Sequence, residues 1–365
     1  MSVSKIIPAI AVAALVLGAG SAKAEEKLLN VYNWSDYIAE DTIQKFEAAT
    51  GIKVNYDVFD SNEILEAKLL TGSTGYDVVV PTANFLERQI KAGVFRKLDK
   101  DKLPNLANMD PVIAERVALH DPDNAHSVTY MWGTTGFGYN VKAIEQRLGE
   151  MPTDSWSLFF DPAVVSKLAD CGVSLLDAPT DVVQTALNYL GLDPNSESPD
   201  DLARAEDLLA KIRPHLRYFH SSQYIEDLAN GETCLAMGYS GDILQAADRA
   251  TEAGQGVEIR YVIPKEGAVI WFDMLAIPAD APHPENAHAF INFVMEPQVA
   301  ADISNYVLYA NANAASMPMV DEEVKNNPSV YPSETVKKNL FPMLARSARY
   351  DRLLKRSWTR LKAGQ

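Results

Sequence analysis

The sequence predicts an α/β protein built from two similar sets of strands and helices. From Leu28 onward, short apolar runs typical of buried strands alternate with segments whose apolar residues recur at helical spacing. A second alternation of this kind begins near Cys171. Such an order favours a parallel sheet with helices on both faces. The chain has 365 residues, which is more than one ordinary core accommodates, so we expect two lobes.

The first set begins with the stretch LLNVYNWSDY at residues 28–37, an apolar run followed by aromatic and polar side chains. The elements expected after it are a helix over 41–51 capped by Asp41, a strand over 52–58, a helix over 61–72 capped by Ser61, and a strand over 76–81 that Pro81 ends. A further helix is expected up to about residue 92. This β-α-β-α-β order predicts that the first strands lie parallel in one sheet.

The second set follows an aromatic and glycine-rich stretch at residues 130–140, which we interpret as a crossing between the lobes. Strands are expected at 171–176, 217–220, 234–238, 257–264 and 268–278, helices at 285–295 and 297–306, and a second crossing at 307–313. The basic stretch 337–362 places Leu354, Trp358 and Leu361 on one helical face. That pattern predicts a helix docked on the second lobe, with membrane binding as the alternative.

The first 24 residues are predicted to be a secretory signal peptide. A positive charge at Lys5 precedes an apolar region over 6–20, and Ala22-Lys23-Ala24 is an A-x-A-type cleavage site. No cysteine follows the apolar region, and no later segment is long and apolar enough to span a bilayer. We therefore expect a soluble exported protein of the periplasm.

The formal net charge of the chain is −16, which disfavours nucleic acid and anionic lipid as partners and favours cations, although solubility alone also accounts for it. The two cysteines, Cys171 and Cys234, are expected to form a disulfide in an oxidising compartment, with two buried thiols as the alternative. Metal-type spacing of Cys and His is absent from the sequence.

Acidic and aromatic residues follow several of the predicted strands. These residues are Trp34, Ser35, Asp36, Tyr37, Thr82, Asp181, Tyr239, Asp242, Trp271 and Asp273, with Tyr309 in the second crossing. Individually, Asp181 and Asp242 could be helix caps and the tryptophans core residues. Together, carboxylates and ring faces without a neighbouring Arg or Lys suit a flexible polyamine.

Motifs of the common enzyme classes are absent. The sequence has no HExxH, P-loop or G-x-S-x-G, and its six histidines are scattered. We therefore predict a protein that is not an enzyme and needs no cofactor. A secreted hydrolase acting on cationic sugars, and a binding module for another cation or a small peptide, remain the alternatives.

Several longer motifs resemble the periplasmic polyamine-binding proteins of ABC importers, close to the putrescine-binding branch. Among them are NWSDY at 33–37, DVFDSNE at 57–63, YFHSSQY at 218–224 and YANAN at 309–313. The resemblance covers essentially the whole chain after the signal peptide. It implies the two-lobed fold of type II periplasmic binding proteins, with a mixed sheet flanked by helices in each lobe and the ligand in the cleft between the lobes. The lobes would comprise residues 25–135 with about 274–308, and 136–273 with about 309–365.

The resemblance also implies roles for individual residues. It implies that Trp34, Tyr37, Tyr239, Trp271 and Tyr309 box the alkyl chain of the ligand and that Asp181, Asp242 and Asp273 bind its ammonium groups. Ser35, Asp36, Thr82 and Ser222 would assist. The partners implied are a polyamine and the membrane permease of an ABC importer, and we expect a monomer.

Three positions depart from the putrescine-binding pattern. Asp181 stands where a glutamate is usual, Tyr239 where a tryptophan is usual, and Trp271 where a phenylalanine is usual. The first two changes open space, and the third provides a larger ring face. The sequence therefore predicts a preference for spermidine, with putrescine-preferring or mixed binding as the alternative.

Overall fold

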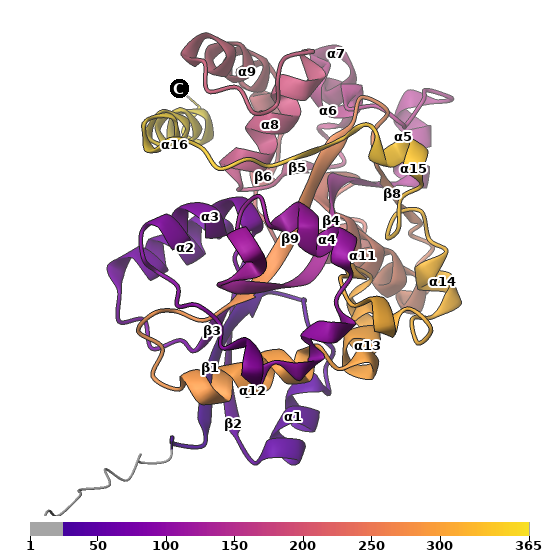
Figure 1. Ribbon diagram of the computed structural model, residues 1–365. Helices are drawn as coiled ribbons and strands as arrows, with labels where there is room; N and C mark the ends of the chain where they lie inside the picture. Colours follow the sequence, from indigo (N-terminus) through magenta and orange to yellow (C-terminus); the bar gives the residue numbers. More distant parts are fainter. Residues whose placement is uncertain (1–24, 365) are drawn as a thin grey trace, which may run out of the picture.

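The structure, a computed structural model, describes residues 25–364, so the predicted signal peptide lies outside the described residues. Its first elements are β1 (Leu28–Trp34), α1 (Thr42–Thr50), β2 (Lys53–Phe59), α2 (Asn62–Thr71), β3 (Val78–Val79), α3 (Ala83–Lys91) and α4 (Pro111–Val117) (Figure 1). Strand β1 lies parallel to both β2 and β3, which confirms the parallel arrangement predicted for the first set. Ser61 caps α2 by accepting a hydrogen bond from the backbone N–H of Ile64, whereas the Asp41 side chain makes no such bond.

The middle of the chain forms the second set. It contains β4 (Ser127–Asn140), α5 (Val141–Leu148), α6 (Ser157–Phe160), α7 (Pro162–Val165), β5 (Val173–Leu175), α8 (Pro179–Tyr189), α9 (Pro199–Ile212), β6 (Tyr218–Phe219), α10 (Tyr224–Ala229), β7 (Leu235–Tyr239) and α11 (Ser240–Ala253). Here β5 lies parallel to β6 and to β7. The predicted repetition of an α/β unit is therefore confirmed.

The last part of the chain returns to both sets. It contains β8 (Ile259–Val262), β9 (Ala268–Ala276), α12 (Pro284–Val294), α13 (Pro297–Val307), β10 (Ala310–Asn311), α14 (Glu322–Lys325), α15 (Glu334–Lys337), β11 (Leu340–Pro342) and α16 (Ala348–Lys362). The predicted strand and helices at 268–278, 285–295 and 297–306 are confirmed with small shifts at their ends. The second crossing is only the two-residue strand β10, which pairs with β4.

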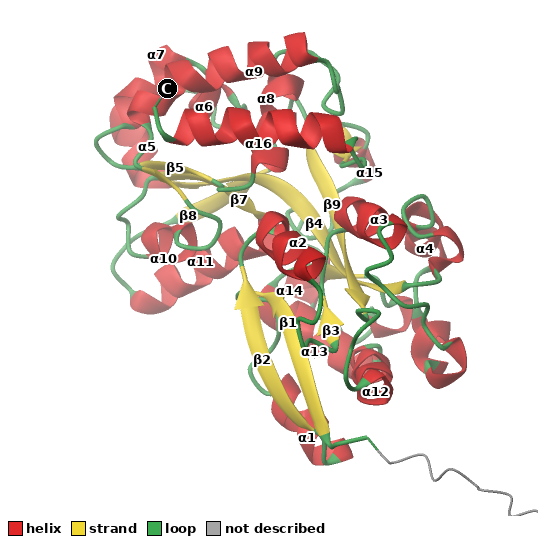
Figure 2. Ribbon diagram, turned by 90° about the vertical axis from the view of Figure 1, so that its left-hand side faces the viewer, coloured by secondary structure: helices red, strands yellow, loops and turns green. Residues whose placement is uncertain are grey.

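Two long strands join the sets into one mixed sheet, whose order is β2-β1-β3-β9-β4-β7-β5-β6. Strand β9 is antiparallel to β3 and to β4, and β4 is antiparallel to β7. All fourteen residues of β4 are buried, in agreement with its prediction as a crossing. In Figure 2, β4 and β9 run between the group β1 to β3 and the group β5 to β7. The sheet therefore passes through both lobes without a break.

The core consists of separate clusters on the two sides of these strands. The cluster of the second set contains the large buried side chains Trp156, Phe159 and Tyr224. The clusters of the first set are built around Phe46 and Phe290 and around Leu65 and Leu86. Residues 309–343 contribute to these latter clusters, and the lobe boundaries given above remain a proposal.

The C-terminal helix is shorter than predicted. Residues 340–342 form β11, which pairs with β9, and α16 begins only at Ala348 with Ser347 as its cap. Leu354, Trp358 and Leu361 are buried in the core of the second set, which confirms the predicted docking. Among the helices of residues 25–364, none has the length and apolar character needed to cross a membrane.

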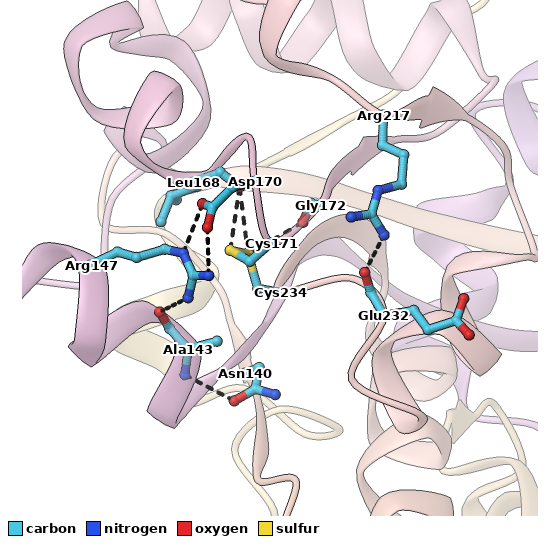
Figure 3. Close-up of a disulfide and its surroundings, with 10 residues drawn as sticks. All are labelled: Asn140, Ala143, Arg147, Leu168, Asp170, Cys171, Gly172, Arg217, Glu232 and Cys234. Carbon is cyan, nitrogen blue, oxygen red and sulfur yellow. Dashed lines mark hydrogen bonds and ion pairs between the residues drawn. A yellow bond between two sulfur atoms is a disulfide. The ribbon is translucent and has the colours of Figure 1, made fainter.

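The two cysteines are joined. Cys171 and Cys234 form a disulfide with their Cα atoms 5.5 Å apart, at a sequence separation of 63 residues (Figure 3). The backbone N–H of Cys234 also donates to the carbonyl oxygen of Gly172 at 2.9 Å. The bond therefore ties the starts of β5 and β7 together, and the prediction of a disulfide rather than two thiols is confirmed.

Candidate functional site

A cavity lies where the two sets meet, at the ends of strands from both. Its walls are formed by Trp34, Ser35, Tyr37, Asp60, Asn62, Thr82, Asp181, Ser221, Tyr239, Asp242, Trp271, Asp273, Tyr309 and Met343. Ten of the twelve residues predicted to contact a ligand are in this wall, and Asp36 and Ser222 are not. Among the described residues 25–364, no lysine or arginine lines the cavity.

The first carboxylate, Asp273, lies in β9 and is held by two hydroxyl groups. The Thr82 hydroxyl donates to Oδ1 at 2.6 Å, and the Tyr37 hydroxyl donates to Oδ2 at 3.0 Å. Asn62 fixes Thr82 in turn, because its Nδ2 donates to the threonine hydroxyl at 2.8 Å. Burial raises the pKa of Asp273 to about 7. The carboxylate is thus oriented, and no cationic side chain of the described residues pairs with it.

The second carboxylate, Asp242, lies in the first turn of α11. The Tyr224 hydroxyl donates to Oδ2 at 2.6 Å, and the Tyr309 hydroxyl donates to Oδ1 at 2.7 Å. Burial raises the pKa of Asp242 to about 7, although both hydrogen bonds favour the ionised form. Gly241 makes this contact feasible, since a Cβ atom there would lie 2.4 Å from the ring of Tyr309. The carboxylate of Asp242 therefore accepts hydrogen bonds from tyrosine side chains and does not cap its own helix.

The third carboxylate, Asp181, lies in the first turn of α8. It accepts a hydrogen bond from the Thr135 hydroxyl at 2.9 Å, and burial raises its pKa to about 6. The neighbouring Thr180 hydroxyl donates to Oε1 of Glu63 at 3.2 Å, and burial raises the pKa of Glu63 to about 7. This contact brings a fourth acidic group from α2 close to the same end of the cavity.

Five aromatic rings form a connected chain around the cavity. Edge-to-face contacts join Tyr37 to Tyr309 at 5.0 Å, Tyr309 to Trp271 at 5.5 Å, Trp271 to Tyr239 at 5.8 Å and Tyr239 to Trp34 at 6.1 Å between ring centroids. The indole Nε1 of Trp34 donates to the Val80 carbonyl at 2.8 Å, which fixes that ring. All five residues are those predicted to box an alkyl chain.

Asp36 lies outside the cavity wall, because the structure turns its side chain away from the cavity. Its backbone has a φ of 52°, and its exposed carboxylate accepts a hydrogen bond from Nη2 of Arg249 at 2.7 Å. Arg249 comes from α11, so this ion pair connects the two sets outside the cavity wall. A second connection of this kind joins Arg88 of α3 to Asp351 of α16 at 2.7 Å.

Ser222 also lies outside the cavity wall. Its backbone N–H and its hydroxyl both contact Nδ1 of His220, at 3.1 and 3.4 Å, which holds it outside the cavity wall. The neighbouring Ser221 lines the cavity instead, and its buried hydroxyl has no hydrogen-bond partner among residues 25–364.

Four wall residues were missed in the sequence. Asp60 and Asn62 follow β2, Ser221 follows β6 and Met343 follows β11. The search for polar residues after strands would have found Asp60 and Asn62, which lie beside the recognised cap Ser61. The strands β6 and β11 have two and three residues, too few for a periodic pattern.

Comparison with known proteins agrees with this architecture. Residues 41–332 match the family model described as bacterial extracellular solute-binding protein. The chain is 54% identical to the putrescine-binding periplasmic protein PotF of Escherichia coli K12, over 98% of this chain and 97% of that protein. It is 52% identical to the putrescine-binding periplasmic protein SpuD of Pseudomonas aeruginosa UCBPP-PA14, over 99% of this chain and 98% of that protein.

More distant relatives have broader names. The spermidine/putrescine-binding periplasmic protein of Salmonella typhimurium LT2 is 36% identical over 90% of each chain. A solved structure titled as a putative spermidine/putrescine ABC transporter from Listeria monocytogenes superposes with a TM-score of 0.84 at 31% identity, covering 93% of this chain and all of that one.

Proposed function

This chain belongs to the bacterial extracellular solute-binding proteins, and from that premise we propose that it binds putrescine and delivers it to the permease of an ABC importer. The observation that carries the proposal is the cavity itself. Three buried carboxylates and a chain of five rings face a cavity whose wall, in the described part of the chain, contains no lysine or arginine. Such a wall suits ammonium groups joined by methylenes. The relatives above half identity, both named for putrescine, support the same ligand class.

The predicted preference for spermidine is not supported. Both relatives above half identity are named for putrescine alone, whereas the relative named for both polyamines is 36% identical. Two of the positions on which that prediction rested, Tyr239 and Trp271, also offset each other in the space that they leave for a ligand. Tyr239 and Trp271 are in edge-to-face contact, so the larger indole occupies space beside the smaller phenol. The alternative of putrescine-preferring binding therefore fits better.

The remaining expectations follow from the family. Solute-binding proteins of ABC importers are not enzymes, so the hydrolase alternative is set aside. The relatives named above are periplasmic, and we place this chain in the periplasm as well. We infer that the lobes close on the ligand and that the closed form docks on the permease. The ligand shifts the equilibrium from the open to the closed form only as far as it binds the closed form more tightly.

Calorimetric titration with putrescine, cadaverine and spermidine tests the proposal. Putrescine is expected to bind at least about ten times more tightly than spermidine, a difference of about 1.4 kcal/mol. Tighter binding of spermidine would overturn the preference. Failure of all three polyamines to bind would overturn the function.

Putrescine binding is expected to weaken as the pH falls from about 8 to about 5. The ammonium groups bind ionised carboxyls, and without a bound cation burial holds the pKa of Asp242 and Asp273 at about 7. Each carboxyl that must ionise lowers the affinity by up to about tenfold per pH unit below its pKa. Calorimetry in two buffers of different ionisation enthalpy measures the released protons. An affinity independent of pH, without proton release, would contradict this prediction.

The stability of the ligand-free protein should respond to pH in the opposite sense. A raised pKa means that the folded chain binds these protons more tightly than the unfolded chain does. The stabilisation from protonation is therefore complete below the unfolded pKa of about 4 and is lost as the pH rises through about 7.

A further inference from the structure

A buried arginine, Arg346, lies three residues after Met343, a residue of the cavity wall. Its side chain is in the segment between β11 and α16, and the residue is only 8% exposed. Nη2 donates to the Pro194 carbonyl at 3.4 Å, while Nε and Nη1 have no hydrogen-bond partner among residues 25–364. No carboxylate of the described chain forms an ion pair with it; the guanidinium lies 5.1 Å from the ring centroid of Tyr350. Burying an unpaired charge lowers the stability of the fold, so we expect this arginine to serve a function.

The segment that carries Arg346 is fixed to the helix that carries Asp181. Met343, three residues earlier, lines the cavity. The backbone N–H of Leu344 donates to Oδ1 of Asn195 at 3.1 Å. The same oxygen accepts a hydrogen bond from Nε2 of Gln184 in α8 at 2.7 Å. Gln184 lies one helical turn after Asp181. The cavity wall, the arginine and the helix are therefore one connected unit.

The charges of Arg346 and Asp181 act on each other. Arg346 favours the ionised form of Asp181 and so moves its pKa downward, against the larger upward effect of burial. Asp181 correspondingly raises the pKa of Arg346, which burial lowers. Tyr350, Asp351 and Glu197 also raise the pKa of Arg346. Arg346 is not among the main influences on the pKa of Asp242 or Asp273, so the guanidinium acts chiefly on Asp181.

We propose that Arg346 is a specificity-determining residue, which disfavours a third ammonium group at the Asp181 end and so selects diamines over triamines. The inference rests on the proposed function. A diamine can place its two ammonium groups on Asp242 and Asp273, whereas a triamine needs a further carboxylate. The buried guanidinium offsets the negative potential of Asp181, because charges in a poorly solvated site are weakly screened.

Calorimetry with putrescine and spermidine on three proteins tests this role. Arg346→Gln removes the charge, and its spermidine affinity is expected to rise by about fivefold or more relative to its putrescine affinity. Arg346→Lys keeps the charge and is expected to keep the wild-type ratio within about twofold. An unchanged ratio in Arg346→Gln, or an equal shift in both variants, would overturn the inference.

Arg346→Met gives a second uncharged variant with a long unbranched side chain, should Arg346→Gln fail to fold. Its spermidine affinity is likewise expected to rise by about fivefold or more relative to its putrescine affinity. A wild-type ratio in Arg346→Met would reject the role of Arg346. If the wild type binds neither ligand, the proposed function fails and the inference fails with it. If the wild type binds putrescine but the ratio of spermidine to putrescine affinity is the same in all variants, only the inference fails.

Discussion

Replacing Asp242 with asparagine is expected to weaken putrescine binding by at least about a hundredfold. The carboxylate is buried and lined up by two tyrosine hydroxyls, so an ammonium group on it would be fully desolvated. Removing one partner of such a pair costs about 2–5 kcal/mol, since the other charge stays buried without compensation. Asparagine preserves the size of the side chain, so the loss should come from the charge. Calorimetric titration of the purified variant measures it.

Asp36→Asn is the matched control. It makes the same chemical change in a residue that the structure places outside the cavity, in an exposed pair with Arg249. Exposed pairs contribute about 0–1 kcal/mol, so the affinity should stay within about fivefold of wild type. The ligand-free Asp242→Asn protein should melt no lower than wild type, because burial disfavours the charge that it removes. Wild-type affinity in Asp242→Asn would mean that this carboxyl serves only the two tyrosines.

Removing the disulfide is expected to lower the free energy of unfolding by about 4 kcal/mol. Cys171 and Cys234 close a loop with a sequence separation of 63 residues, and the chain-entropy model gives about this value for such a loop. Urea unfolding of the Cys171→Ser/Cys234→Ser double variant measures the difference. Reduction of the wild type should reproduce it, and reduction of the variant should have no effect. A change below about 0.5 kcal/mol would show that the unfolded chain gains little freedom when the loop opens.

Much of the fold could be predicted because its signals are local. Apolar runs, helical spacing and a cap such as Ser61 lie within a few residues of one another, and the strands and helices they predict are largely present. The failures involve long-range contacts. Nothing in the sequence around Leu340 shows that it pairs with Ala268 in the middle of the sheet, so β11 was read as part of a helix. The short β10 similarly exists only because β4 lies beside it.

The site could be predicted where chemistry follows a recognisable strand. Asp273 and Tyr239 belong to strands whose apolar runs are long enough to read. The position of Asp36 outside the wall could not be predicted, because its orientation depends on a backbone turn with positive φ and on Arg249, which is far away in the sequence. The preference between putrescine and spermidine was harder to predict than the position of the site. Tyr239 and Trp271 both depart from the putrescine-binding pattern, and the contact between their rings means that the effect of one on the cavity depends on the other. Their separation in the sequence does not show this.

The continuity of β4 has a consequence for any attempt to divide the molecule. One stretch of this strand pairs with β9, and the stretch that ends it pairs with β7 and β8. A fragment cut between the lobes would leave a row of unpaired backbone N–H and C=O groups on a buried, apolar strand. Such an edge is a template for pairing with another chain, so a single excised lobe would be prone to aggregate. A sensor or truncated binder built from this protein must therefore retain β4 and β9 together with the strands on both of their sides.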